Sequence, residues 1–579
     1  MALIRLTLAR AKQYWAPIAA VIALQFLSTL ALLWLPSLNA KIIDEGIANG
    51  DLGFIWRTGA TMLGASIVQI FCAIGAIYFG ARTAMAIGRD LRQDVYAHVN
   101  TLSTVQTTTF GAGTLITRGT NDVQQVQLLT LMTLNFMVTT PLMSVGGIIM
   151  ALREDAGLAW LVWVAVGVLA VVVGWLVWLL LPLFRSMQDR IDAINSVLRE
   201  QIMGLRVVRA FVREDFETER YDTANRNITR VSLKVGNLFV LMFPAVTMVL
   251  HLATAAVLWF GAERVDAGQI EVGSLTAFLQ YLMLILVAVM MGIFMMMLVP
   301  RAVVSAERIE ALLRTEAELK YPEVAVAPDP GHGRIEFRNV TFGFPGAEKP
   351  VIHNVSFTVE PRTTTAIVGS TGSGKTVLLH LLLRMFDPQH GSITIDGVPV
   401  KDLTRAQLAQ AMALVPQQQY LFGGTIASNL RFGREDASDA ELWEALETAQ
   451  AKDFVTATAG GLDEPVAQGG ASVSGGQRQR LSIARALIAD PLIYLFDDSF
   501  SALDVKTDAK LRAALPKATP NATRLVVAQR VSSIMDADQI LVLDRGEIVG
   551  RGRHEELLET SEVYREIVAS QLDEGEAQA

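Results

Sequence analysis

The sequence predicts a multidomain membrane protein in which a six-helix transmembrane domain precedes an α/β domain. Six long runs without a charged residue fill most of the first 300 residues, and strand-like and helix-like patterns alternate from residue 334 onward. The composition agrees, since the 579 residues are 51% hydrophobic and only 18% charged. Soluble domains are nearer ~25% charged. This excludes an ordinary soluble enzyme and a disordered chain.

The net charge and the cysteine content argue against further classes of protein. The net charge of −8 argues against a nucleic-acid partner held by bulk electrostatics. Cys72 is the single cysteine, so neither an intrachain disulfide nor a cysteine-based metal site can form. Arginine outnumbers lysine, 38 to 11, which is typical of GC-rich bacterial genomes.

Each of the six apolar runs is long enough to cross a bilayer, which takes about 20 residues. The transmembrane domain is predicted over residues 16–320, with an amphipathic end to its last helix. Residues 1–15 are expected to lie at the membrane interface, because the apolar run that follows is too long for a cleaved leader. The predicted spans are about 16–38, 58–81, 123–152, 156–184, 235–262 and 272–300.

The basic residues in the connections predict the orientation. The connections on one side hold four Lys and Arg, and the N-terminus with the connections on the other side holds seventeen. Basic connections stay inside. We therefore expect a multi-pass protein of the plasma (inner) membrane of a bacterium, with both termini and the α/β domain cytoplasmic.

Residues 321–333 are rich in Pro and Gly and are predicted to be a linker. Residues 334–579 are predicted to form the α/β domain, with a mostly parallel sheet. Within it, residues 369–376 fit the phosphate-loop pattern G-x-x-x-x-G-K-[ST], after an apolar strand and before a helix. The pattern predicts an ATP and Mg²⁺ site, in which Lys375 faces the terminal phosphates and Thr376 the metal. Its residues are Gly369, Ser370, Thr371, Gly372, Ser373, Gly374, Lys375 and Thr376.

Two further segments carry related chemistry. An apolar strand at 492–498 ends in two acids, and Asp497 is placed to hold the Mg²⁺ shell. Ser474, Gly475 and Gly476 open a helix, which makes a second anion site. One domain has no use for two sites for a terminal phosphate. The second site is therefore expected to serve the ATP of another domain.

Taken together, these motifs resemble those of a half-transporter of the ATP-binding cassette (ABC) family, in its six-span exporter class. VSGGQ at 473–477 matches the family signature, and SALD at 501–504 matches the loop that crosses between paired cassettes. VPQ at 415–417 matches the glutamine loop. Phe344 stands where the family places an adenine-stacking aromatic residue.

The resemblance implies roles and parts that the motifs do not spell out. Ser474, Gly475, Gly476 and Gln477 would contact the ATP of a partner, and Asp504 would lie between the cassettes. Gln417 would join Thr376 and Asp497 at the metal or face the attacking water. A helical subdomain is implied within the nucleotide-binding domain. Coupling helices that dock on the cassettes are implied near 106–116 and 211–217.

Three departures from the family pattern are informative. Asp498 replaces the glutamate that usually acts as the base, and a carboxylate displaced by about 1 Å can cost roughly 100-fold in rate. Gln529 replaces the switch histidine and cannot carry positive charge. Gln468 replaces a glutamate near the coupling region. An ATP site that binds well but hydrolyses poorly, beside an intact signature, predicts a heterodimer with a second, different half-transporter.

The transported substrate is less specified. Spans without charge disfavour a proton-coupled carrier and suit a hydrophobic or amphipathic molecule, a drug or a lipid. An importer of fatty acids or an iron chelate built on the exporter fold, a homodimeric exporter and a nucleotide-gated channel stay open as alternatives. Polar residues within spans either line a cavity or cross-link helices: Gln25, Gln69, Asn135 and Gln280.

Overall fold

The computed structural model describes residues 2–136, 138–325 and 331–577. The chain folds into two compact units. The membrane unit comprises Met1–Thr101 and Phe110–Glu316, and the α/β unit comprises Leu102–Thr109 and Ala317–Ala579. The units part close to the predicted linker 321–333, of which residues 326–330 lie outside the described part of the chain.

The membrane unit is helical. Within the described residues, six helical segments are long and apolar enough to cross a membrane, as predicted: Trp15–Ile47, Leu52–Val99, Ala112–Glu154, Ala159–Met203, Glu214–Asp266 and Val272–Gly292. Its α-helices are α1 (Ala2–Ala11), α2 (Trp15–Lys41), α3 (Leu52–Val99), α5 (Ala112–Thr117), α6 (Val123–Phe136), α7 (Thr139–Glu154), α8 (Ala159–Met203), α9 (Leu205–Ala210), α10 (Glu214–Asp266) and α11 (Val272–Leu313).

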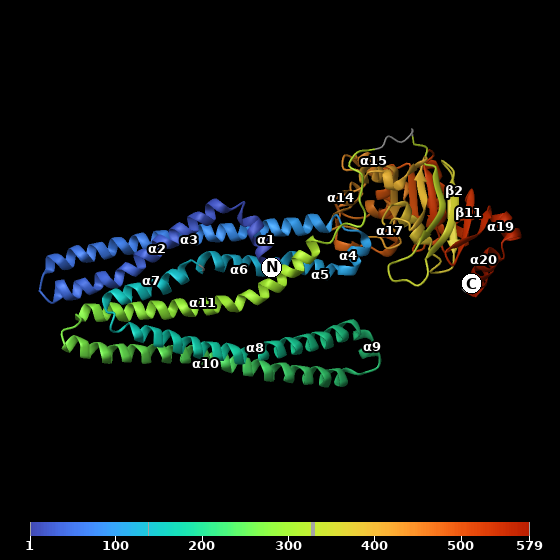
Figure 1. Cartoon of the computed structure of the whole chain (residues 1–579). Helices are drawn as coiled ribbons and strands as arrows, with labels where there is room; N and C mark the ends of the chain where they lie inside the picture. Colours follow the sequence, from blue (N-terminus) through green and yellow to red (C-terminus); the bar gives the residue numbers. More distant parts are fainter. Residues whose placement is uncertain (1, 137, 326–330, 578–579) are drawn as a thin grey trace. The chain divides into compact units, whose positions relative to one another are not determined.

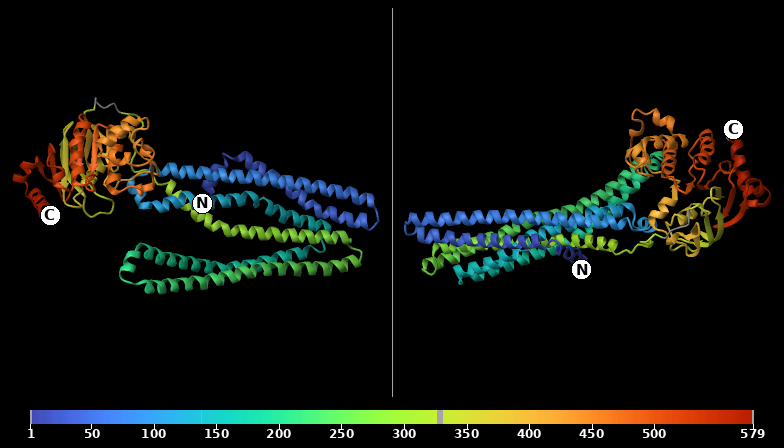
Figure 2. Two further views of the ribbon diagram at one scale, coloured as in Figure 1. Left: turned by 180° about the vertical axis from the view of Figure 1, so that it is seen from behind. Right: turned by 90° about the horizontal axis from the view of Figure 1, so that it is seen from above.

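Two pairs of long helices run side by side, α2 with α3 and α8 with α10 (Figures 1 and 2). The short helix α9 forms the tip of the hairpin between α8 and α10. The chain turns there because α8 ends at Gly204 and Val212 adopts a positive φ of 51°. This tip lies earlier than the predicted coupling segment 211–217, whose residues from Glu214 onward already belong to α10.

Ion pairs hold the first helix, α1, against the long helices of the membrane unit. Arg10 forms an ion pair with Asp94 of α3, and Arg5 forms one with Glu310 of α11, at 3.0 Å. The Tyr14 hydroxyl donates to Asp90 at 2.7 Å.

Gln25 of α2 contacts the C-terminal end of α6 in the third span. Its side-chain Nε2 donates to the carbonyl oxygens of Leu134 and Asn135, at 2.5 and 3.0 Å. These carbonyls belong to the last turn of α6, and the Asn135 carbonyl also accepts from the Thr139 hydroxyl at 3.3 Å. Gln25 therefore cross-links two helices, and Gln69 accepts a bond from Ser28 through its backbone carbonyl at 3.1 Å.

The α/β unit is built on a six-stranded sheet of order β12-β11-β3-β10-β9-β6, parallel except for β12. A second, antiparallel sheet has the order β2-β1-β4-β5, and β7 pairs with β8. The strands are β1 (Ile335–Phe342), β2 (Ile352–Val359), β3 (Thr364–Gly369), β4 (His390–Ile395), β5 (Val398–Pro399), β6 (Met412–Val415), β7 (Gly424–Thr425), β8 (Pro465–Val466), β9 (Ile493–Asp497), β10 (Thr523–Val527), β11 (Gln539–Asp544) and β12 (Glu547–Gly552).

Helices cover both sides of the parallel sheet, as parallel strands require. Alternate residues of β10 reach opposite cores, since Val526 packs with α17 and α18 whereas Leu525 and Val527 pack with α12 and β1. The predicted helical subdomain is α14–α17, between β7 and β9. The helices are α4 (Thr104–Phe110), α12 (Lys375–Leu382), α13 (Arg405–Ala411), α14 (Ile426–Leu430), α15 (Asp439–Thr448), α16 (Lys452–Thr456), α17 (Gly475–Ala489), α18 (Val505–Ala518), α19 (His554–Thr560) and α20 (Glu562–Ala577).

The short helix α4 packs on the α/β unit, although the chain reaches it from α3. Val105 is half-buried against the core that contains α12, and the Ser103 hydroxyl donates to Glu318 at 3.0 Å. The predicted coupling segment 106–116 therefore begins in α4. Its later residues lie in α5, which belongs to the membrane unit.

Candidate functional site

A hollow of about 260 Å³ lies at the carboxyl ends of β3, β9 and β10, and we call it the nucleotide hollow. Ligands of parallel α/β sheets bind at this edge. Nine of the residues predicted for the site line it together: Thr371, Gly372, Gly374, Lys375, Thr376, Gln417, Asp497, Asp498 and Gln529.

The loop from Gly369 to Gly374 has the shape that its glycines allow. Gly372 and Gly374 adopt φ values of 84° and 100°, which side chains disfavour. A Cβ on Gly369 would lie 2.0 Å from the carbonyl oxygen of Leu543 on β11. The glycines thus let the loop pass close to the sheet and turn into α12, whose N-terminus points its free N–H groups at the hollow.

Lys375 is buried, with only 8% of its surface exposed. Its Nζ donates to the carbonyl oxygens of Gly369 and Ser370, at 2.7 and 2.8 Å. Burial lowers the pKa of this amine, and the charges of Asp498 and Asp497 oppose that shift. The loop thus holds the ammonium group in place before a phosphate arrives.

Two of the residues predicted to hold the metal are hydrogen-bonded to each other. The Thr376 hydroxyl donates to Asp497 Oδ1 at 2.9 Å. Burial raises the pKa of Asp497, and the bond from Thr376 partly offsets this. The Ser373 hydroxyl is buried and has no hydrogen-bond partner among the described residues. A hydroxyl, a carboxylate and an unpartnered loop hydroxyl beside a buried lysine fit ATP with Mg²⁺.

Asp498 stands in the base position with a strained backbone. Its φ is 48°, in the left-handed region, and its N–H donates to the Val527 carbonyl at 2.9 Å. Burial raises the pKa of its carboxyl group, against the hydrogen bonds from Ser501, the Gln529 backbone and Gln417. Asp498 is therefore oriented from three sides. The sequence placed Ser501 in the loop expected to cross between cassettes but did not predict its contact with Asp498.

The backbone at the switch position, Gln529, is held by a residue of the C-terminal helix α20. Gln571 of α20 donates through Nε2 to the Gln529 carbonyl at 2.6 Å and accepts from the Val531 N–H at 2.8 Å. The C-terminal helix thus clamps the segment that carries Gln529. Sequence reasoning missed Gln571, because no local pattern links residues that are 42 positions apart.

The signature residues lie away from the nucleotide hollow, since none of them lines it. Ser474 caps α17, with Ser474 N–H donating to Gln477 Oε1 at 2.9 Å and Gln477 N–H donating to Ser474 Oγ at 3.3 Å. Gly475 has open space where a Cβ would stand, and Gly476 faces the carbonyl of Ala502 in the SALD loop. Asp504 caps α18 by accepting from the Thr507 N–H at 3.0 Å, and hydrogen bonds from the side chain and then the backbone of Thr507 lower its pKa.

Phe344 is also outside the lining of the nucleotide hollow. Its ring packs edge-on against Phe342 and Phe386, with ring centroids 5.2 and 5.6 Å apart, and remains 39% exposed. An exposed ring that is held by two neighbours can offer a face for stacking.

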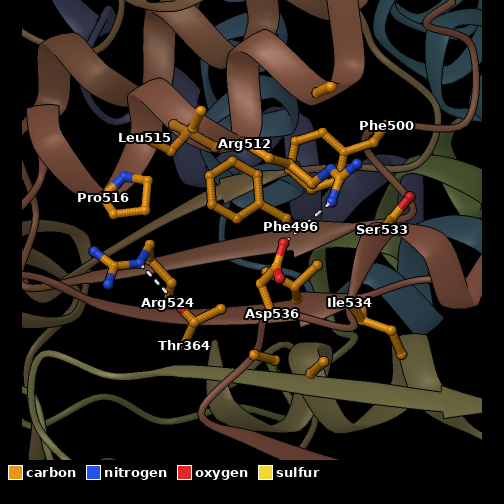
Figure 3. A pocket seen from close by; sticks show the side chains of 15 residues that line it. Thr364, Phe496, Phe500, Arg512, Leu515, Pro516, Arg524, Ser533, Ile534 and Asp536 are labelled. Carbon is orange, nitrogen blue, oxygen red and sulfur yellow. Dashed lines mark hydrogen bonds and ion pairs between the residues drawn. The ribbon is translucent and has the colours of Figure 1, made fainter. Parts of the chain in front are cut away.

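A second hollow of the α/β unit, of about 420 Å³, lies between α18 and the amino ends of β3 and β10 (Figure 3). It contains none of the predicted site residues. Its charged side chains are already engaged, because Arg524 donates to Thr364 and Thr519, at 2.8 Å each, and Arg512 pairs with Asp508 at 3.2 Å. The chemistry therefore concentrates in the nucleotide hollow.

Comparison with known proteins agrees with this geometry. Residues 18–290 match the ABC transporter transmembrane region, and residues 352–501 match the ABC transporter domain. An uncharacterized ABC transporter ATP-binding protein of Mycobacterium tuberculosis is 48% identical over 564 residues, covering 97% of each chain. An ATP-dependent lipid A-core flippase of Desulfotalea psychrophila is 32% identical, covering 90% of this chain and 91% of its own.

The fold has a solved counterpart. A bacterial Atm1-family ABC exporter with ATP bound superposes with a TM-score of 0.79, at 24% identity, over 97% of this chain and 99% of that one. The two family models and the 48% identical relative show that the chain belongs to the ABC transporter family. It is a multi-pass membrane protein whose nucleotide-binding domain binds ATP with Mg²⁺.

Proposed function

We propose that this chain is one half of a heterodimeric ABC exporter and carries its degenerate ATP site. ATP binding would drive transport of a hydrophobic or amphipathic substrate, a drug or a lipid, by alternating access. The observation that carries the proposal is the content of the nucleotide hollow. Lys375, Thr376 and Asp497 supply phosphate and metal binding, whereas Asp498 and Gln529 stand where a longer base and a cation are expected.

ATP binding and ATP hydrolysis require different properties of these residues. Binding needs the charge of Lys375 and the oxygens of Thr376 and Asp497, which are in contact. Hydrolysis needs a base within reach of the attacking water. Asp498 is one methylene shorter than glutamate, and its strained backbone leaves little freedom to compensate. Slow turnover with tight binding follows.

The signature turn supports a partner. Ser474 and Gln477 form a regular helix cap that presents backbone N–H groups, and neither residue lines the chain's own hollow. The turn is thus available to the ATP of the second half-transporter. Main turnover would occur at that shared site, between this signature and the partner's phosphate loop.

The tip of the hairpin between α8 and α10 also supports a dimer. It exposes a cluster of apolar side chains. Such a cluster on a water-facing surface indicates a protein partner. We infer that the tip docks on the nucleotide-binding domain of the other half. The exposed residues are Ile202, Met203, Val207, Phe211, Val212 and Phe216.

Two facts favour an amphipathic substrate. The relatives of this chain include a protein named as an ATP-dependent lipid A-core flippase. The six predicted spans contain no charged residue. Transport direction in sealed vesicles distinguishes export from import.

The test uses the full-length chain purified alone in lipid, with MgATP binding and ATP hydrolysis measured in parallel. The chain alone is expected to bind MgATP with little hydrolysis. Adding the partner half-transporter at a 1:1 ratio should restore turnover. In the heterodimer, the double variant D498E/Q529H should raise turnover at this chain's own site by about 100-fold. Vigorous hydrolysis by the chain alone would instead indicate a homodimeric exporter.

A further inference from the structure

An open apolar groove runs along the membrane unit between α2, α3 and α7. Its volume of about 880 Å³ falls in the range of about 300–1,000 Å³ typical of small-molecule sites. Leu30 and Trp34 of α2, Val68 of α3 and Ile149 of α7 line it, and each is about half exposed. The groove thus offers a long apolar wall that the described part of this chain leaves open.

One cation stands at the groove, at the last turn of α7. Arg153 lines it, and within the described residues no acidic group forms an ion pair with this side chain. The two acidic residues that follow it are already engaged. Glu154 accepts from the Ser37 hydroxyl at 2.7 Å, and Asp155 pairs with Arg264 at 2.7 Å. Among the residues that the structure describes, Arg153 therefore has no acidic partner, although two carboxylates follow it in the sequence.

The position of Arg153 fits a lipid headgroup. It lies at the end of the third span opposite the cytoplasmic extensions, where a side chain reaches the headgroup region of the bilayer. Trp34, in the same groove, is 50% exposed, and tryptophan is enriched at this depth. A guanidinium group matches the geometry of a phosphate.

We propose that this groove binds a resident phospholipid of net negative charge, whose phosphate pairs with Arg153 and whose acyl chain lies along α2, α3 and α7. The site goes beyond the proposed transport function, because one chain forms it alone and it needs neither ATP nor a transported substrate. A zwitterionic lipid carries a second charge of the opposite sign and should bind more weakly.

The groove walls provide matched variants. A Cβ on Gly64 would meet nothing within 4 Å, so G64L would fill the groove without a clash in α3. Gly59 lies in the same helix, also has open space around a Cβ and does not line the groove, so G59L is its control. Arg57, likewise in α3 and outside the groove lining, provides the control R57Q for R153Q.

The experiment measures quenching of Trp34 fluorescence by phospholipids with brominated acyl chains. The full-length transporter is used with and without its partner, and the W34F protein is subtracted. Brominated phosphatidylglycerol should half-quench Trp34 at a concentration about fivefold lower than brominated phosphatidylcholine, the size expected for one cation near the membrane surface. R153Q should remove that preference and R57Q should keep it. G64L should abolish the quenching by both lipids and G59L should not.

Three outcomes would overturn the proposal. One is equal quenching by the two lipids in the unmodified protein. Another is a loss of preference that is the same in R57Q as in R153Q. The third is quenching that disappears once the partner half-transporter is present, which would assign the groove to the dimer interface. Each can be separated from failure of the transport proposal, because lipid binding is read without ATP.

Discussion

The nucleotide hollow and the signature turn are the two regions of this chain that we propose act on ATP. They differ in how closely their residues follow the family pattern. The hollow brings together Lys375, Thr376 and Asp497, which we propose bind MgATP, with Asp498 and Gln529, which we propose make its hydrolysis slow. The signature turn keeps the family sequence and a regular helix cap. Binding depends on charge and backbone shape, which tolerate a nearby substitution, whereas catalysis depends on the position of a single carboxylate. Degeneracy can therefore affect turnover while binding persists.

The largest expected effect is on ATP binding and comes from a substitution in the nucleotide hollow. Lys375→Ala should weaken MgATP binding to the chain by about 2–5 kcal/mol, because it removes the partner of a buried charge. Titration of the full-length protein with a fluorescent ATP analogue measures this. Lys349→Ala, at an exposed position outside the hollow, is the control and should bind as before.

The next largest effect is on turnover and comes from a substitution in the signature turn that leaves the nucleotide hollow unchanged. Gly475→Glu should lower turnover of the complex at least about 100-fold, because a carboxylate beside phosphate adds a like-charge contact that costs several kcal/mol. Gly475→Ala introduces no clash in this chain, since nothing lies within 4 Å of its Cβ, and should retain most turnover. ATP binding by this chain alone should not change. If Gly475→Glu left turnover intact, the signature would not serve a partner site.

The pH dependence of MgATP binding sharpens the comparison. Burial raises the pKa of Asp497 above its ordinary value of about 3.9. The proton is therefore retained to a higher pH than on a free aspartate, and Mg²⁺ must displace it. MgATP affinity should be full at neutral pH and fall as pH drops through that raised pKa. Metal-free ATP binding should depend much less on pH over this window. The two titration curves, measured on the same preparation, would coincide if Asp497 did not hold the metal.

The smallest effect concerns the switch segment. Gln571→Ala removes two hydrogen bonds to the backbone at 529 and 531, each worth about 1 kcal/mol. Amide hydrogen exchange at Val531 should accelerate by tenfold or more, with a few-fold change in turnover. Ser570→Ala loses only a bond to Ile567 within its own helix and should leave this amide protected. Equal exchange in both variants would show that α20 does not hold the switch.

Much of the protein was accessible from its sequence. Uncharged runs of about 20 residues and the phosphate-loop glycines are local signals, so the six spans and the loop at 369–376 were predicted and the structure agrees. The position of α9, Leu205–Ala210, at the tip between α8 and α10 was not predicted; the coupling segment was expected near 211–217. Helical periodicity continues on both sides of the tip, and the positive φ of Val212 leaves no mark in an ordinary valine.

The sequence alone determined the family, the span count and the chemical types present at each motif, because these depend on residue identity and short spacing. Only the tertiary structure decided which of them meet. It brought Asp497 against Thr376, separated Ser474 from the nucleotide hollow and placed Gln571 on the switch segment. Within the described part of the chain, it also left Arg153 without an ion pair, because the neighbouring Glu154 and Asp155 bind Ser37 and Arg264. Contacts between distant residues are fixed by how helices and strands pack, and that packing is not written in any local pattern.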